Sequence, residues 1–185
     1  KASSDLLVRS YHKTYDFPSI IVNASNNYGP KQYPEKLIPL TLLNALSKKT
    51  LPIYGDGQQV RDWLFVGDHV NALMAIITSG HLGESYCIGA DNEMCNLALV
   101  HLLCDTLDDL KPNETSYRDL IEFVKDRPGH DFRYATDSSK LKKHTGWAPT
   151  TSLKKGMQQT VEWYLNSFEN QKIEHHKTKR MGLGK

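Results

Sequence analysis

The sequence predicts an α/β fold with a smaller α+β lobe attached, and three observations support this. A helical pattern over Ala2–Tyr15 leads directly into a short apolar strand at Ser19–Ser25, which is the order of an α/β unit. Strands then alternate with helices, whereas the later elements are smaller and mixed. The segment Val70–Gly89 again resembles α/β material. We therefore expect the two parts to interleave along the chain.

Composition narrows the class of protein and of partner. The 185 residues are 39% hydrophobic and 24% charged, which is ordinary for a soluble globular protein. The net charge is +2 with both signs interspersed, which argues against a nucleic-acid partner. No apolar run approaches membrane-spanning length, and no signal-peptide pattern opens the chain. We expect neither nucleic acid nor a membrane as partner.

The cysteines and the first residue add two expectations. Cys87, Cys95 and Cys104 are odd in number and lack metal-ligand or redox spacing, so we expect reduced thiols in a cytoplasmic protein. Residue 1 is lysine rather than methionine, which predicts a fragment, a processed product or a trimmed form.

The first polar candidates follow the first strand. The helix is expected to end at 16–18, and the strand runs into Asn26 and Asn27 within a segment that we predict as a turn, 26–30. In open α/β sheets ligands bind beyond the carboxyl ends of strands. The two asparagines are therefore either ligand contacts or a simple Asx turn.

A helix, two strands and a turn come next. Glu35–Lys48 is predicted as a helix despite Pro39, which sits near its first turn, where proline is tolerated. Leu51–Tyr54 and Gln58–Val66 are predicted strands separated by a Gly-Asp-Gly turn. This triplet lacks the third glycine and the strand–helix context of a phosphate loop.

The second of these strands carries a candidate anion binder. Its residues alternate, so that Arg61, Trp63 and Phe65 share one face. Arg61 is either a stacked anion-binding residue or one half of a structural salt bridge to Asp62 or another carboxylate.

Two further helices and a strand are predicted from apolar periodicity. Asp68 is expected to cap a helix that ends at Gly80, and Glu84–Gly89 reads as a buried strand. Asn96 is expected to cap a helix over Leu97–Leu110. The core stripes predicted for these helices are Val70, Leu73, Met74 and Ile77 in the first, and Val100, Leu103, Cys104 and Leu107 in the second.

The loop Lys125–Asp137 concentrates groups that can bind phosphate. It follows a polar loop at Lys111–Ser116 and a short strand predicted at Ile121–Val124. Pro128 and Gly129 define a turn that presents Arg127 and His130. Arginine offers a planar fork of donors suited to phosphate, and histidine donates one or two hydrogen bonds. The alternative is a surface turn with satisfied charges.

The C-terminal part is predicted as two helices and a tail. A short helix begins at Ser138 or Ser139 and stops at Gly146, and Trp147 is expected in the core. Ser152 caps a final helix with an inward stripe formed by Leu153, Met157, Thr160, Val161, Tyr164, Leu165 and Phe168. We expect 169–185 to be a disordered basic tail. Its adjacent histidines, His175 and His176, lack further ligands, so no metal site is expected.

Several motifs resemble those of a known family. They are K-A-S-S-D at 1–5, S-N-N-Y-G-P at 25–30, P-E-K-L-I-P at 34–39, L-P-I-Y-G at 51–55, R-D-W-L-F-V at 61–66, D-R-P-G-H-D at 126–131 and T-V-E-W-Y-L at 160–165. Together they resemble the C-terminal half of the dTDP-glucose 4,6-dehydratases, which are extended short-chain dehydrogenase/reductases acting on nucleotide sugars. The resemblance runs from Lys1 to about Phe168, and its most specific motifs are R-D-W-L-F-V and D-R-P-G-H-D.

The resemblance implies a lyase reaction with a bound NAD. The sugar is oxidised at C4, water is lost across C5 and C6, and the hydride returns to C6, which converts dTDP-glucose to dTDP-4-keto-6-deoxyglucose. NAD is regenerated within each turnover and so acts as a bound cofactor. There are two alternatives. One is a related nucleotide-sugar epimerase, decarboxylase or dehydratase, and the other is a non-catalytic fragment for nucleotide-sugar binding or dimerisation.

The resemblance also implies residue roles. Lys1 matches the catalytic, cofactor-holding lysine of the Y-x-x-x-K pair, and Asn27 matches a position near the nicotinamide. Arg61 matches an arginine that holds the diphosphate. The positions matching substrate contacts are Asn26, Lys36, Leu37, Pro52, Ile53, Tyr54, Arg61, Asn96, Asp126, Arg127, Pro128, Gly129 and His130.

The resemblance further implies a domain division, a homodimer, and a lack of activity when the chain is on its own. Residues 1–28 and 67–92 would belong to a doubly wound Rossmann-type NAD-binding domain, and 29–66 with most of 93–168 to an α+β nucleotide-sugar-binding lobe. A homodimer through the Ala2–Tyr15 helix is expected. The chain contains no G-x-x-G-x-x-G loop, and it lacks the tyrosine and the acid–base pair of the family. We therefore expect no activity alone and an exposed, aggregation-prone sheet edge.

Overall fold

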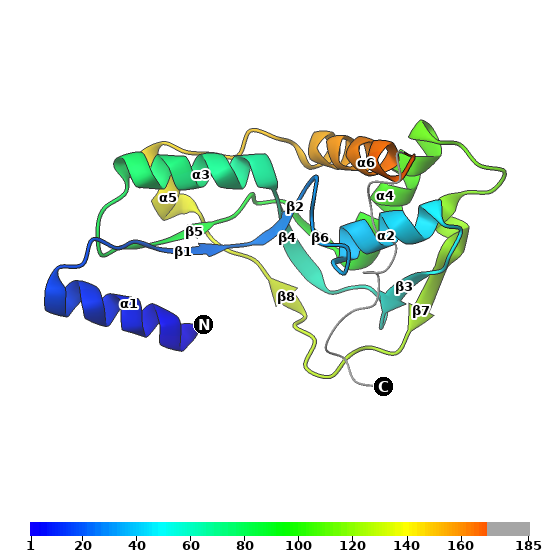
Figure 1. The fold of residues 1–185 in the computed structure, drawn as a ribbon. Coiled ribbons are helices and arrows are strands. Elements are labelled where there is room, and N and C mark those ends of the chain that lie inside the picture. The colour runs from blue at the N-terminus through cyan, green and yellow to red at the C-terminus, as the bar shows by residue number, and fades with distance from the viewer. Residues whose placement is uncertain (170–185) are drawn as a thin grey trace.

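One end of the molecule is built on a pair of parallel strands. The computed structural model describes residues 1–169. β1 (Ile21–Ala24) pairs in parallel with β5 (Ser85–Ile88). α3 (Val66–Ser79) lies on one side of this pair and α1 (Ala2–Tyr15) on the other, as Figure 1 shows. Within the described residues β1 has no strand on its other edge, as the sequence predicts.

β4 (Val60–Phe65) is the central strand of the molecule. It pairs in parallel with β2 (Asn26–Tyr28) and β8 (Arg133–Tyr134), and antiparallel with β6 (Glu93–Cys95). It therefore joins segments that are more than a hundred residues apart in the sequence.

The other end packs three helices beside a second parallel pair. β3 (Leu51–Tyr54) pairs with β7 (Ile121–Val124), and a short 3-10 helix, η1 (Tyr117–Leu120), precedes β7. Figure 1 shows α2 (Leu37–Leu46), α4 (Asn96–Leu110) and α6 (Leu153–Glu169) grouped at this end.

Two hydrophobic clusters match these two ends. The larger one unites α2, α4 and α6 with the strands, and includes Leu42, Trp63, Leu103, Met157 and Tyr164. The smaller one lies between α3, the β1–β5 pair and α5 (Ser139–Thr145), and includes Leu64, Ala72, Tyr86, Leu141 and Trp147. The clusters are two packed regions, and the boundaries predicted for the two interleaved lobes stay a prediction.

Most predicted elements are confirmed, but three strands differ from expectation. The segment 26–30, predicted as a turn, begins with strand β2, whose Tyr28 is buried. Asparagine rarely occurs in strands, and pairing with β4 overrides this local preference. The short strands β6 and β8 were not predicted. Both are edge segments whose extended shape comes from pairing with β4.

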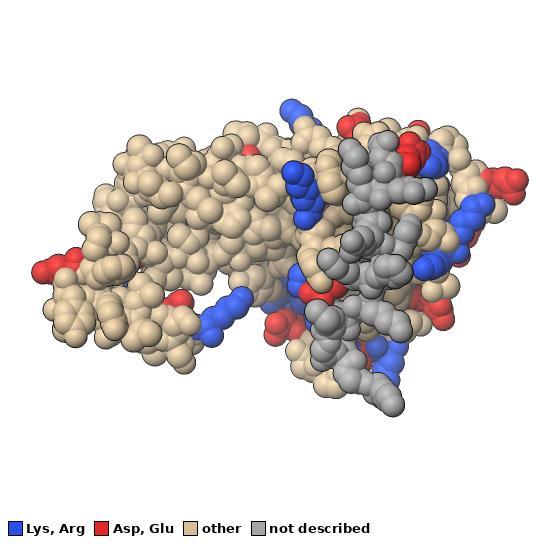
Figure 2. All heavy atoms as spheres, viewed as in Figure 1, with Lys and Arg blue, Asp and Glu red and all other residues tan. Residues whose placement is uncertain are grey.

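The stripe predicted to bury α3 is mostly wrong, because only its Leu73 packs against the smaller cluster. Val70, Met74 and Ile77 are 52%, 57% and 76% exposed, whereas Ala72 and Ile76 are buried. On the face shown in Figure 2, few charged side chains lie over this end of the molecule. Periodicity identifies an apolar helix face, but it does not identify what covers that face.

Neither predicted N-cap at Asp68 or Asn96 is found. α3 begins two residues before Asp68, with Phe65 at its N-cap position, and α4 begins at Asn96 itself, with Cys95 at the N-cap position. Asp68 instead accepts hydrogen bonds from Thr150 and Thr151. The buried stripe predicted for α4 is confirmed: Val100, Leu103, Cys104 and Leu107 are fully buried.

The C-terminal helices follow the prediction. Gly146 ends α5 in the left-handed conformation, and Ser152 Oγ accepts the Lys155 N–H at the start of α6. Glu169, assigned by prediction to the tail, is the last residue of α6. The remainder of the predicted tail, with His175 and His176, lies outside the described residues.

Further features of residues 1–169 bear on cofactors and location. All three cysteines are free, and Cys104 is buried. No helix among these residues combines the length and apolarity needed to cross a bilayer. The same residues contain no group of three or more metal-ligating side chains placed to hold an ion.

Asp68 is expected to make stability depend on pH. Burial alone raises the pKa of this 3% exposed carboxyl group, but hydrogen bonds from Thr151 and Thr150 outweigh that effect and hold the pKa below its ordinary value. A group whose pKa is lowered by folding contributes stability above its unfolded pKa, about 3.9, and loses that contribution as the pH falls through the folded pKa. Asp68→Asn should therefore cost about 1–3 kcal/mol at pH 7 and less at pH 3. Urea unfolding at both pH values tests this.

The matched control for Asp68 is Asp109→Asn, which removes an exposed carboxylate from α4. We expect it to change stability by at most about 0.5 kcal/mol at both pH values. An equal penalty for Asp68→Asn at pH 7 and pH 3 would contradict the proposed linkage.

Candidate functional site

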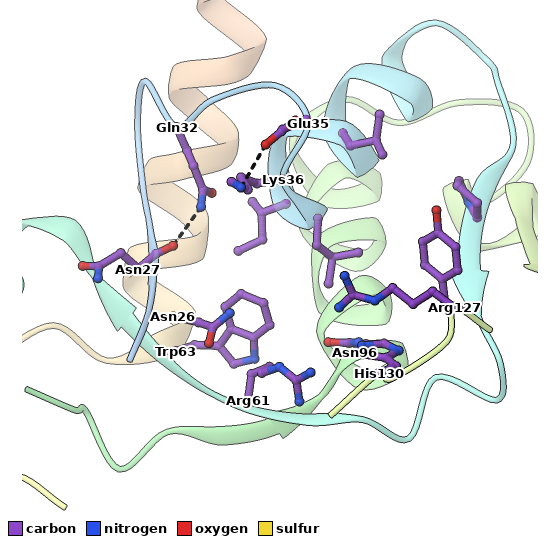
Figure 3. A pocket seen from close by; sticks show the side chains of 15 residues that line it. Asn26, Asn27, Gln32, Glu35, Lys36, Arg61, Trp63, Asn96, Arg127 and His130 are labelled. Carbon is purple, nitrogen blue, oxygen red and sulfur yellow. Dashed lines mark hydrogen bonds and ion pairs between the residues drawn. The ribbon is translucent and has the colours of Figure 1, made fainter. Parts of the chain in front are cut away.

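A cavity of about 270 Å³ lies where the segments around β4 meet. It is walled by β2, β3, β4, the starts of α2 and α4, and the 126–130 loop (Figure 3). Its polar and charged lining is formed by Asn26, Asn27, Gln32, Glu35, Lys36, Tyr54, Arg61, Asn96, Arg127 and His130, and its apolar lining by Leu37, Ile38, Leu40, Pro52 and Trp63.

Two helices begin at the cavity. Lys36 occupies the N-cap position of α2, and Asn96 is the first residue of α4. A helix N-terminus carries partial positive charge on its free N–H groups, so both helices add positive potential to the cavity. This favours a negatively charged ligand.

Arg61 is buried and anchored to the main chain. Its side chain donates to the main-chain oxygens of Val60 at 2.6 Å and Asp131 at 2.8 Å, with a longer contact to Phe132 at 3.5 Å. Burial lowers the pKa of Arg61 from its ordinary value, against the raising effect of Asp131. The expected salt bridge to Asp62 is not formed, because that carboxylate accepts the N–H groups of Ala90 and Asn92. These bonds use at most three of the five guanidinium donors, which leaves donors available to a ligand.

Several buried polar atoms at the cavity have no protein partner. These atoms are Arg127 Nε, Asn27 Oδ1 and Gln32 Oε1. The other ends of the two amides are held, because Gln32 Nε2 donates to the Asn27 main-chain oxygen and Asn27 Nδ2 donates to that of Ser25. A buried polar atom left unpaired costs free energy, so its presence beside a cavity indicates a ligand that pairs with it.

The charges of the lining favour an anion. Arg61, Arg127 and Lys36 face only one lining carboxylate, Glu35, which lies 2.9 Å from the Lys36 ammonium group. Figure 3 shows the Arg127 side chain reaching over Asn96 and His130, with Arg61 on the adjoining wall. Two guanidinium groups at one cavity suit a diphosphate, because each can pair with phosphate in bidentate geometry.

The structure brings most of the predicted site residues together. Asn26, Asn27, Lys36, Leu37, Pro52, Tyr54, Arg61, Asn96, Arg127 and His130 all line the cavity. Five others do not: Ile53 is a core residue, Lys1 is exposed at the start of α1, and Asp126, Pro128 and Gly129 belong to the loop but do not line the cavity.

Sequence reasoning missed Gln32, Glu35, Ile38, Leu40 and Trp63 among the lining residues. The alternation along β4 already placed Trp63 on the face of Arg61, and this signal could have identified it. The other four surround Lys36 and Leu37 in the sequence, but no chemical feature separates them from ordinary loop and helix residues.

The chain is similar to proteins of one enzyme family. A family model described as GDP-mannose 4,6 dehydratase matches residues 1–160. The dTDP-glucose 4,6-dehydratase of Neisseria gonorrhoeae is 53% identical over 171 residues, which cover 90% of this chain and 49% of that protein. The dTDP-glucose 4,6-dehydratase 1 of Escherichia coli K12 is 54% identical, with 90% and 46% covered.

Solved structures give the same result. The dTDP-glucose 4,6-dehydratase of Bacillus anthracis, in complex with NAD, aligns with a TM-score of 0.82 at 45% identity over 91% of this chain and 51% of that one. A UDP-glucuronic acid 4-epimerase of Bacillus cereus aligns with a TM-score of 0.79 at only 26% identity, over 90% and 51%.

These similarities confirm the predicted fold class and the predicted resemblance. The chain spans about half the length of the curated relatives it matches. Since the family model matches most of the chain, the chain belongs to the GDP-mannose 4,6-dehydratase family of nucleotide-sugar enzymes, and its curated relatives are dTDP-glucose 4,6-dehydratases.

Proposed function

We propose that this chain forms the nucleotide-sugar pocket of a dTDP-glucose 4,6-dehydratase. The observation that carries the proposal is the convergence of Arg61, Arg127 and His130 on one cavity from segments far apart in the sequence. The relatives support a dehydratase over an epimerase, because solved dehydratases are 41–45% identical and the UDP-glucuronic acid 4-epimerase is 26% identical.

In the proposed reaction the sugar is oxidised at C4, water is removed across C5 and C6, and the sugar is reduced at C6. NAD, when bound, supplies the hydride acceptor and returns the hydride. The C4 ketone acidifies the C5 proton, which makes loss of water feasible. The part assigned to this chain is to hold the diphosphate through Arg61 and Arg127, and the sugar side of the ligand through Asn26 and its neighbours. Fixed geometry at the diphosphate supplies the orientation on which the reaction depends.

The residues present fit one end of the cofactor. Asn27 Oδ1 is buried without a hydrogen-bond partner, so it can accept from an amide such as that of nicotinamide. The Lys1 side chain is exposed at the N-cap position of α1. The proposed assignment of Lys1 and Asn27 is to the nicotinamide ribose end of the cofactor.

We propose α1 as part of a homodimer interface. None of its residues is buried, and Leu6, Leu7, Tyr11 and Tyr15 are each at least half exposed. Leu7 and Tyr11 line one apolar depression with Val8 and Phe17, and an exposed apolar surface of this kind is uncommon on a protein that has no partner there.

Arg61→Ala tests the proposed pocket. Loss of a charged hydrogen bond to phosphate should weaken dTDP-glucose binding by about 1.5–3 kcal/mol, or roughly 10- to 150-fold in Kd. Isothermal titration calorimetry of the chain with dTDP-glucose measures the change. Arg61→Lys keeps the charge but not the fork, so we expect an intermediate loss.

The matched control is Arg118→Ala, which removes an exposed guanidinium group paired with Asp105. We expect its affinity for dTDP-glucose to stay within about twofold of the parent. Unchanged affinity together with lowered stability in Arg61→Ala would assign Arg61 a structural role instead.

A further inference from the structure

His130 is held from behind by a carboxylate. Its Nδ1 lies 2.8 Å from Asp126 Oδ1, and its side chain is only 5% exposed. The same oxygen accepts the Arg127 main-chain N–H at 2.8 Å. Asp126 does not line the cavity, whereas His130 and Arg127 do. Asp126 therefore acts on a ligand through these two residues.

Gln59 fixes this carboxylate in turn. Its side chain donates from Nε2 to Asp126 Oδ2 at 2.9 Å, and its main-chain oxygen accepts the Asn96 N–H at 3.0 Å. The residue is 6% exposed, so its position is set by packing. Gln59 thus ties the 126–130 loop to the start of α4, and both elements wall the cavity. No motif of the sequence had identified it.

The Asp126–His130 contact determines what His130 can offer a ligand. The pKa of Asp126 is lowered, mainly by its hydrogen bond with His130, so the carboxyl group is ionised and acts only as an acceptor. A proton is therefore required on His130 Nδ1. In the neutral ring Nε2 then lacks a proton and cannot donate to a phosphate oxygen. A second proton makes Nε2 a donor and the ring a cation.

The surroundings of His130 contain charges of both signs. The cations of the lining are Arg61 on β4, Arg127 on the same loop and Lys36 at the start of α2. The acidic groups are Asp126 and Asp131 on its own loop and Glu35 beside Lys36, and Tyr54 on β3 is the remaining titratable group of the lining. An anionic ligand adds negative charge among these cations, which shifts the balance toward the protonated ring.

We propose that Gln59 and Asp126 are positioning residues that orient His130 toward the cavity, and that His130 takes up a proton when the ligand's diphosphate binds. This rests on the proposed function, because the ligand is taken to be a nucleotide diphosphate sugar. Asp126, which the family resemblance placed among substrate contacts, then acts one step removed from the ligand.

Calorimetric titration with dTDP-glucose between pH 5.5 and 8.5 tests the proposal. Both phosphates of this ligand are esterified, so the ligand itself does not titrate in this range. In the parent chain we expect Kd to be about tenfold higher at pH 8.5 than at pH 5.5. Repeating the titration at pH 6.5 in buffers of different ionisation enthalpy should show net proton uptake.

The variants separate positioning from simple folding. Asp126→Asn keeps the shape and removes the charge, so we expect about tenfold weaker binding at pH 6 and a flattened pH profile. His130→Gln should flatten the profile equally. Gln59→Asn and Gln59→Leu should weaken binding with a profile shifted to lower pH. Glu122→Gln removes an exposed carboxylate from β7 and should leave affinity and profile unchanged.

The outcomes distinguish this proposal from the proposed function. An unaltered pH profile in a folded Asp126→Asn variant would overturn the positioning role. Tight binding by the parent chain without pH dependence or proton uptake would overturn the role of His130 while leaving the nucleotide-sugar pocket intact. Absence of binding at every pH would refute the proposed function itself.

Discussion

The 185-residue chain, mixed with NAD and dTDP-glucose, is expected to form no 4-keto product. The reaction needs a hydride acceptor held against C4 and an acid–base pair beside C5 and C6. The 185 residues contain no G-x-x-G-x-x-G loop for the cofactor pyrophosphate and no Y-x-x-x-K motif. A positioned acid–base pair alone contributes about 10²–10⁴-fold in rate, so the joint loss should reduce turnover to background. Absorbance of the keto product in alkali measures the result.

The positive control for this assay is an intact relative, such as the dehydratase of Neisseria gonorrhoeae. The informative comparison joins the present chain to a segment that supplies a glycine-rich loop and a Y-x-x-x run directly before Lys1. Activity should appear in the joined protein, and Arg61→Ala should reduce it. Turnover by the 185 residues alone would refute this prediction.

Trp63→Ala is expected to cause the largest loss of stability. Trp63 is 4% exposed, belongs to the larger hydrophobic cluster and also lines the cavity. Truncating a buried tryptophan removes its apolar contacts and leaves a void, at a cost of about 3–5 kcal/mol. Domains are stable by only about 5–15 kcal/mol, so the urea midpoint should fall by a large fraction of its value.

The control is Phe132→Ala, which truncates an aromatic side chain that is 70% exposed. Its effect should stay within about 0.5 kcal/mol. Trp63→Phe retains most of the buried area and should lose less stability than the alanine variant. A midpoint for Trp63→Ala equal to that of the control would show that the β4 wall does not depend on this side chain.

The local sequence pattern was sufficient to predict the buried face of a helix where burial follows the helical period. The stripes of α4 and α6 were predicted correctly, because their apolar side chains pack against helices and strands of the same chain. The prediction for α3 failed for the opposite reason, because Val70, Met74 and Ile77 are more than half exposed within residues 1–169. A helical period is a property of one segment, whereas burial is a property of two.

The residues of the site were predicted mainly from motif resemblance, whereas the contacts that hold them in place were not predicted. Arg61 and Arg127 were correctly associated with one cavity, although 66 positions separate them. The support from Gln59 could not be predicted, because a lone glutamine before a strand has no local signature. Likewise β2 depends on pairing with β4, and no property of Asn26 and Asn27 themselves favours an extended strand.

The position of β4 has a consequence for how such a pocket can change. This strand supplies Arg61 and Trp63 to the cavity while pairing with three other strands. Substitutions on it alter ligand recognition and stability together, and are therefore hard to accumulate. Substitutions at the cavity rims, at Lys36, Tyr54 and 126–130, should affect stability less. Divergence toward new sugars or bases should accordingly concentrate in these rims, with β4 as the part of the pocket least free to evolve.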